Sequence, residues 1–166
     1  MTKALAFLIA VLFALPALAG DLPDPKLTPG ALDPSVIDQS ATLDVICHQS
    51  TSGRRHVTDA EKEQTFKAYG ITQEHRADCT GPSKPGKGIL PACWEIDHLC
   101  SLELGCDNVA ANRWPQRYDG QWGAHVKDKL ENKLHALVCA GKIPLDQARR
   151  DISTDWIAAY RKYMPQ

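Results

Sequence analysis

The chain has 166 residues, of which 43% are hydrophobic and 23% charged, with 19 basic and 20 acidic side chains. This length suits one domain rather than several. The near-neutral balance argues against the strongly basic surface of a tight nucleic-acid binder, although an enzyme that releases its product does not need one.

Residues 1–19 are typical of a secretory signal peptide. A positively charged start is followed by an apolar run over residues 4–15 and by Ala17-Leu18-Ala19, the small-x-small pattern that signal peptidase cuts. We therefore expect cleavage before Gly20 or Asp21 and a secreted or periplasmic protein. A membrane anchor is the alternative, but the apolar run is shorter than the ~20 residues that span a bilayer.

The mature chain is expected to begin with an irregular segment. Residues 20–42 are rich in Pro, Asp and Gly and have no periodic apolar face, which predicts an extended arm lying on the domain or a linker. The domain itself is expected over residues 43–166, and residues 43–47 (Leu-Asp-Val-Ile-Cys) are interpreted as a short strand.

Residues 58–61 have the pattern of a helix N-terminus. Thr58 and Glu61 have the spacing of a capping box, in which each side chain bonds the backbone N–H of the other end. The helix is predicted to run to Tyr69, with Phe66 and Tyr69 on its inner side and Gly70 as its left-handed stop.

The second half of the domain is predicted to contain a strand and two helices. Residues 94–104 alternate enough to form a strand that enters a turn at Gly105. Apolar positions recur at helical spacing over residues 124–139, and Gly141 ends that helix. A second helix is expected to begin at Pro144, with an inner face made of Leu145, Ala148, Ile152, Trp156, Ala159, Tyr160 and Tyr163.

Six cysteines, all in the mature part, imply a disulfide framework in an exported chain, and six allow fifteen pairings. Their spacing favours the pairs Cys47–Cys139, Cys79–Cys93 and Cys100–Cys106. The first is a long-range link, the second closes a Pro- and Gly-rich loop over residues 78–92, and the third spans a short turn. The alternative is a zinc site without a C-x-x-C knuckle, drawn from Cys93, His98, Cys100 and Cys106.

Asp97 and His98 are the residues most suited to chemistry. A carboxylate is a hard oxygen ligand for Mg²⁺, and a neutral imidazole takes a proton from water to make hydroxide beside a phosphodiester. A metal ion then offsets charge on the phosphate and on the leaving oxygen. Neighbouring side chains on a strand point to opposite faces, so both reach one centre only if the strand bends into a loop.

The stretch EIDHLCSLELGCDNVAANRWPQ resembles the E-x-DH-L-x-P-L-E-x-GG…x-NLWP-[QE] signature of exported bacterial HNH-type (ββα-metal) nuclease-like proteins. The likeness extends over nearly all of the mature chain, and Val45-Ile-Cys47 resembles the family's first strand. It implies an α+β fold, in which a small ββα finger carries Asp97 and His98 on a hairpin and the last metal ligand on a helix. Additional C-terminal helices and disulfides complete the expected fold.

The resemblance also implies roles for single residues. His98 matches the general base, Asp97 the adjacent metal ligand, and Asn112 the residue that holds the loop and orients the base. The last ligand is expected at Gln121 or, with a longer loop, at His125, Asp128 or Asn132. We favour His125, with Asp128 or water as substitutes, although a solvated histidine on the first turn of a helix is the simpler interpretation of His125.

Supporting roles are expected for charged residues around this set. Glu131 is interpreted as a water-linked carboxylate beside the metal, or as an ordinary i,i+4 partner of Lys127. Arg55, within the basic segment 54–56, is a candidate phosphate contact, and a solvated basic turn is the alternative.

Two departures from the signature and the tryptophans complete the set of expectations. Cys100-Ser101 stands where the family has Ile-Pro, and Cys106 replaces its second Gly, so a bridge between the two cysteines is expected to pin the loop after His98. Trp114 and Trp122 are candidates for stacking on bases, while a core position is favoured for Trp94, Trp114 and Trp156.

The sequence therefore predicts a metal-dependent endonuclease of low sequence specificity that hydrolyses DNA, with RNA as an alternative substrate. One divalent ion is expected, Mg²⁺ before Mn²⁺ or Zn²⁺, and no small-molecule cofactor. Nucleic acid is the expected partner of a monomer that does not bind membranes. The main alternative is a non-catalytic exported binding module that keeps the fold, and a third interpretation is an inhibitor or structural protein held by disulfides.

Overall fold

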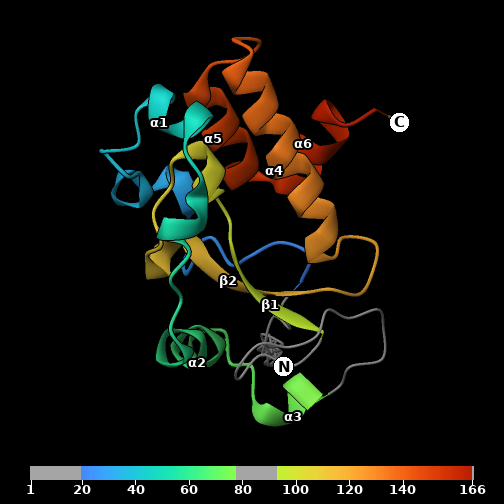
Figure 1. Ribbon diagram of the computed structural model, residues 1–166. Helices are drawn as coiled ribbons and strands as arrows, with labels where there is room; N and C mark the ends of the chain where they lie inside the picture. The colour runs from blue at the N-terminus through green and yellow to red at the C-terminus, as the bar shows by residue number, and fades with distance from the viewer. Residues whose placement is uncertain (1–19, 78–92, 166) are drawn as a thin grey trace, which may run out of the picture.

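The computed structural model describes residues 20–77 and 93–165. The expected signal peptide and the loop over residues 78–92, with Cys79, lie outside the described residues. Within them the fold is α+β, with α-helices, short 3₁₀ turns and one two-stranded antiparallel sheet (Figure 1). No helix of these ranges combines the length and the apolar character that crossing a bilayer requires.

The sheet pairs β1 (Trp94–His98) with β2 (Arg113–Arg117), so that Asp97 lies opposite Trp114 and His98 opposite Arg113. The predicted strand over residues 94–104 is too long. It ends at His98 because the buried Asn112 side chain bonds both backbone groups of Cys100, which removes them from the ladder. Residues 102–104 then form a 3₁₀ turn that ends at Gly105, whose φ is 71°.

Helix α4 (Ala124–Cys139) has the predicted bounds, and Gly141 follows it with a φ of 65°. The predicted helix from Pro144 to Tyr163 is wrong in one respect, because it is two helices, α5 (Leu145–Thr154) and α6 (Trp156–Tyr163). Asp155 has extended backbone angles and its side chain accepts from Ala158 N at 2.9 Å, so it starts a new helix instead of continuing the old one.

Residues 43–47 do not form the predicted strand. They belong to α1 (Leu43–His48), whose first turn is capped by Thr42. The β-branched residues favour a strand by propensity, but the cap and the acidic Asp44 near the helix start favour the helix. The bond Cys47–Cys139 then ties α1 to the end of α4.

Residues 20–42 lie on the domain as an irregular arm with two 3₁₀ turns, Gly30–Leu32 and Pro34–Val36. Val36 is fully buried, and its carbonyl accepts from Asp107 N at 2.7 Å. Ile37 forms an isolated bridge with Cys106. The arm thus packs against the loop that follows β1.

Helix α2 (Asp59–Ala68) has the predicted capping box, and Gly70 follows with a φ of 66°. A small apolar cluster that includes Phe66, Trp94 and Ile96 lies between α2 and β1, with α3 (Gln73–Ala77) beyond it. The main core lies on the other side of the sheet, under α4, α5 and α6 (Figure 1). The sheet is therefore covered on both faces.

Two of the predicted disulfides, Cys47–Cys139 and Cys100–Cys106, are present. The alternative zinc site is wrong, because two of its thiols are joined to each other. Trp94, Trp114 and Trp156 are buried as predicted. Trp122 packs edge-on against Trp156 and Tyr160, and a guanidinium covers its ring, so neither Trp114 nor Trp122 presents a face to a base.

Candidate active site

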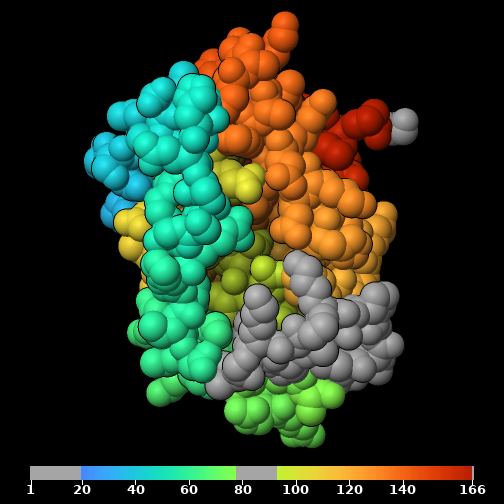
Figure 2. Space-filling view, viewed as in Figure 1, coloured from blue at the N-terminus to red at the C-terminus, as the bar shows by residue number. Residues whose placement is uncertain are grey.

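The space-filling view shows a hollow in the molecular surface (Figure 2). Its floor is the yellow-green part of the chain, at β1 and the residues after it. The cyan and teal segment around residues 42–60 forms one wall, and the orange α4 forms the other. The hollow thus lies where β1 ends, which is the part of the chain that carries Asp97 and His98.

The His98 side chain is almost completely buried, with 8% of the residue exposed. Its Nε2 lies 2.8 Å from Oδ1 of Asn108, and Nδ2 of Asn108 donates to the carbonyl of His56 at 2.6 Å. Burial is the main cause that lowers the pKa of His98 below its ordinary value, against the hydrogen bond that the ring makes to Asn108 Oδ1, which raises it. Burial therefore favours the neutral imidazole, which is the form that accepts a proton.

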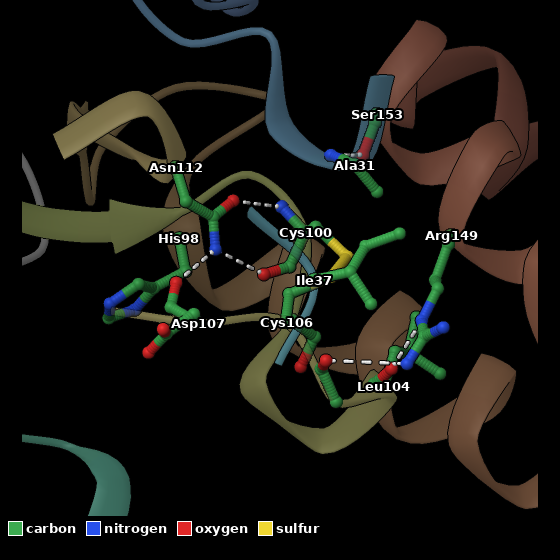
Figure 3. The surroundings of a disulfide bond; sticks show 12 residues. Ala31, Ile37, His98, Cys100, Leu104, Cys106, Asp107, Asn112, Arg149 and Ser153 are labelled. Carbon is green, nitrogen blue, oxygen red and sulfur yellow. Dashed lines mark hydrogen bonds between the residues drawn. A yellow bond between two sulfur atoms is a disulfide. The ribbon is translucent and has the colours of Figure 1, made fainter. Parts of the chain in front are cut away.

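Asn112 holds the loop that follows His98 (Figure 3). Its Oδ1 accepts from Cys100 N at 2.8 Å, and its Nδ2 donates to the carbonyls of Cys100 and Asp107, both at 2.9 Å. The Cys100–Cys106 bond closes the same loop. Asn112 is fully buried and acts on His98 through the backbone rather than by bonding the imidazole.

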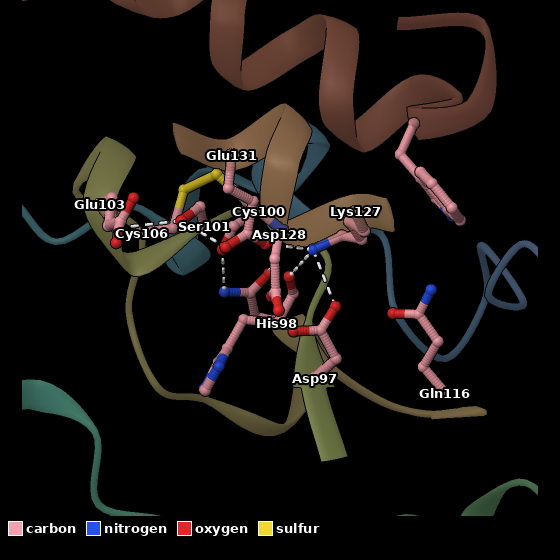
Figure 4. Close-up of polar contacts among 12 residues, drawn as sticks. Asp97, His98, Cys100, Ser101, Glu103, Cys106, Gln116, Lys127, Asp128 and Glu131 are labelled. Atoms are coloured by element: carbon pink, nitrogen blue, oxygen red, sulfur yellow. Dashed lines mark hydrogen bonds and ion pairs between the residues drawn. A yellow bond between two sulfur atoms is a disulfide. The ribbon is translucent and has the colours of Figure 1, made fainter. Parts of the chain in front are cut away.

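Asp97 points to the opposite face of β1, toward α4 (Figure 4). Its Oδ2 lies 2.8 Å from Nζ of the fully buried Lys127. Nζ also donates to the carbonyl of His98 at 2.6 Å and to Oε1 of Glu131. Burial opposes the charge of Lys127, but the two carboxylates outweigh it and raise its pKa above the usual value. The three N–H donors of this ammonium therefore have three acceptors.

Glu131 is the i,i+4 partner of Lys127 that the sequence offered as one of its two interpretations, and both side chains are buried. Ser101 Oγ donates to its second carboxylate oxygen at 3.1 Å. Burial raises the pKa of Glu131 to about 7, with Lys127 opposing the shift and Asp97 adding to it. The i,i+4 spacing was a correct signal for the pair, but its burial depends on how α4 packs on β1.

The expected metal ligands come together only in part. Asp97 and Asp128 lie in one neighbourhood, together with Lys127 and Glu131 (Figure 4). His125 is exposed, and its ring lies close to Gly123. A Cβ atom added to Gly123 would be 3.1 Å from Nδ1 of His125. Across residues 20–77 and 93–165, no group of three or more His, Cys, Asp or Glu side chains is arranged to hold a metal ion.

Tyr118 and Glu95 belong to the site, although the sequence alone did not mark Tyr118. The Tyr118 hydroxyl donates to Oε2 of Glu95. Burial, followed by this carboxylate, raises the pKa of Tyr118 far above its ordinary value. Glu95 and Asp97 are two residues apart on one strand and so share a face of the sheet.

Arg55 is a second basic side chain, after Lys127, whose charge acts on His98. It is half-exposed, its guanidinium lies 3.8 Å from Oε1 of Glu103, and its charge helps to lower the pKa of His98. Arg54 instead lies 3.6 Å from Asp38 of the arm. Of these two arginines, Arg55 is the one whose charge acts on His98, whereas Arg54 is paired with the arm.

Comparison of the chain with protein-family models, with curated proteins and with solved structures found no match.

Proposed function

We propose that the protein is a nuclease that hydrolyses phosphodiester bonds, with His98 as its general base. One observation carries the proposal: a buried imidazole with a fixed hydrogen-bond partner lies beside a surface hollow, in a neighbourhood that also holds several carboxylates. The order β1, β2, α4 agrees with a ββα finger, which we propose for this part of the fold.

The residues divide the work by charge. His98 takes a proton from the attacking water, because its neutral ring has an unprotonated nitrogen. Arg55 is placed to contact a phosphate oxygen, since its guanidinium is half-exposed and its charge reaches His98. Asn112 and Lys127 hold His98 through the loop and through its own carbonyl.

The expected divalent ion fits as a weakly held, largely hydrated ion and not as an ion in a closed cage. Mg²⁺ is commonly bound through one or two carboxylates and keeps several waters. Asp97 and Asp128 are the carboxylates that would hold it, with Asp97 sharing its charge with Lys127. When bound, the ion offsets charge that develops on the phosphate.

The test is cleavage of plasmid DNA and of RNA by the oxidised chain with Mg²⁺, Mn²⁺ or EDTA. His98→Ala is expected to lower the rate by about 10²–10⁴-fold, the usual contribution of a general base. The matched control is His48→Ala, because His48 is a largely exposed histidine on α1. Equal rates in both variants and in the unchanged chain would refute the assignment of the base.

A non-catalytic binding module is the second candidate. It is favoured by the contact between Lys127 and Asp97, which already neutralises a carboxylate that an ion would need. A folded chain that cuts neither DNA nor RNA with any of these ions, yet binds one of them, would support this alternative.

The disulfides are compatible with an extracellular or periplasmic location. Together with the signal sequence, they lead us to propose that the protein is exported.

A further inference from the structure

Asn108 lies between two groups that are far apart in the sequence. It is 10 residues from His98 and 52 from His56, and its side chain contacts both. One amide atom is 2.8 Å from Nε2 of His98 and the other is 2.6 Å from the His56 carbonyl oxygen. The loop that carries Asn108 is held in place by Asn112 and by the Cys100–Cys106 bond.

The carbonyl of His56 decides how this amide is oriented. A carbonyl oxygen only accepts hydrogen bonds, so the atom of Asn108 that faces it must be the NH₂ group. The amide oxygen then faces His98, and this oxygen is also an acceptor only. Nε2 of His98 must therefore carry the proton of the neutral ring, and the lone pair is left on Nδ1.

We propose that Asn108 is a positioning residue that fixes neutral His98 as the Nε2–H tautomer and so makes Nδ1 the base. The inference rests on the proposed nuclease function. In the reaction an O–H bond of water breaks and an N–H bond forms at Nδ1. The hydroxide oxygen bonds to phosphorus, and the bond between phosphorus and the leaving oxygen breaks. The leaving oxygen is then protonated from solvent. His98 ends the step with both nitrogens protonated, while Nε2–H still donates to Asn108.

The tautomer is observable without any substrate. In ¹⁵N-histidine-labelled protein, the nitrogen shifts and the long-range couplings to the ring protons report which nitrogen of His98 carries the proton. We expect an Nε2–H signature in the unchanged chain and a mixture of tautomers in Asn108→Ala. Asn108→Asp keeps an oxygen acceptor near Nε2, so it is expected to restore the Nε2–H signature.

Cleavage rates are measured on the same samples. Asn108→Ala is expected to cut about fivefold to tenfold more slowly, which is the effect of losing one hydrogen bond. Gln39→Ala is the control, because Gln39 is an exposed amide side chain of the arm that donates to the carbonyl of Ile37. Amide spectra of residues far from the site show whether each variant is folded. If Asn108→Ala is unfolded, Asn108→Asp still tests the inference.

The outcomes separate the two proposals. An Nδ1–H signature in a chain that cleaves nucleic acid would overturn the role of Asn108 and leave the nuclease intact. An Nε2–H signature in a folded chain that cleaves nothing would overturn the nuclease and with it the role of Nδ1. Asn108→Ala with an unchanged tautomer and rate would overturn the inference alone.

Discussion

Lys127 connects β1 and α4, the two elements that carry most of the candidate site. Its ammonium bonds Asp97 on β1, Glu131 on α4 and the carbonyl of His98. Because its three donors are used within the protein, it does not have one left for a phosphate. Lys127 therefore sets where the end of β1 lies against α4, and it fixes the position of His98 without touching the imidazole.

Lys127→Met is expected to destabilise the protein strongly. The change leaves the carboxylates of Asp97 and Glu131 buried without their cation, and breaking a buried ion pair in this way costs about 3–5 kcal/mol. The free energy of unfolding is measured by urea denaturation. The control, Lys129→Met, changes an exposed lysine of the same helix and is expected to stay within about 0.5 kcal/mol of the unchanged chain.

Adding Glu131→Gln to Lys127→Met is expected to recover part of the lost unfolding free energy, because it removes one of the buried carboxylate charges that no longer have a cation. Lys127→Met that unfolds with the same free energy as Lys129→Met would show that the buried pair does not hold β1 and α4 together.

The sequence marked the adjacent Asp97 and His98 as candidates for chemistry, but it did not indicate their partners. The strand periodicity already indicates that the two side chains point to opposite faces. The bond from Asn108 to His56 spans 52 residues, and the contact between Lys127 and Asp97 spans two elements, so neither follows from local spacing. Residue types suggested the chemistry that we propose, and tertiary packing determines which atoms would carry it.

At the scale of elements, predictions succeeded where one local signal was strong and unopposed. The capping box at Thr58 and the long apolar period that ends before Gly141 each fixed a helix. Predictions failed where signals conflicted. The β-branched residues after Thr42 favour a strand although Thr42 caps a helix, and the apolar spacing after Pro144 continues past the second cap at Asp155.

The docking of α2 on β2 is expected to depend on pH through Glu61. Its carboxylate bonds Arg113 at 2.6 Å and the Thr58 N–H at 2.8 Å, and these bonds, that from Arg113 first, lower its pKa from 4.5 to about 2. A lowered folded-state pKa means that the stabilisation is complete above pH 4.5 and is lost as the pH falls toward 2.

Glu61→Gln tests this dependence. The difference in unfolding free energy between the unchanged chain and the variant is expected to shrink steadily between pH 5 and pH 2 (roughly the interval between the two pKa values). Glu74→Gln, which removes a glutamate from the first turn of α3, serves as the control. A difference that is constant with pH would mean that the carboxylate of Glu61 is not ionised more readily in the folded state.

At the scale of the whole molecule, the two described disulfides have different tasks. Cys47–Cys139 joins residues 92 positions apart and ties α1 to the end of α4. Cys100–Cys106 closes only a short loop, but that loop follows His98 and carries the backbone groups that Asn112 bonds. The first bond constrains the unfolded chain more, whereas the second constrains the candidate site more.

Removing each disulfide separately is expected to show that one contributes more to stability and the other more to activity. In the loop-entropy model, Cys47→Ala/Cys139→Ala loses about 4–5 kcal/mol of unfolding free energy and Cys100→Ala/Cys106→Ala loses about 2–3 kcal/mol. The opposite order is expected for the loss of cleavage rate, which is measured at a temperature where both variants are folded. The second variant is expected to be slower, because the loop that orients His98 is no longer closed. A second variant that cleaves as fast as the unchanged chain would mean that Asn112 alone holds the loop.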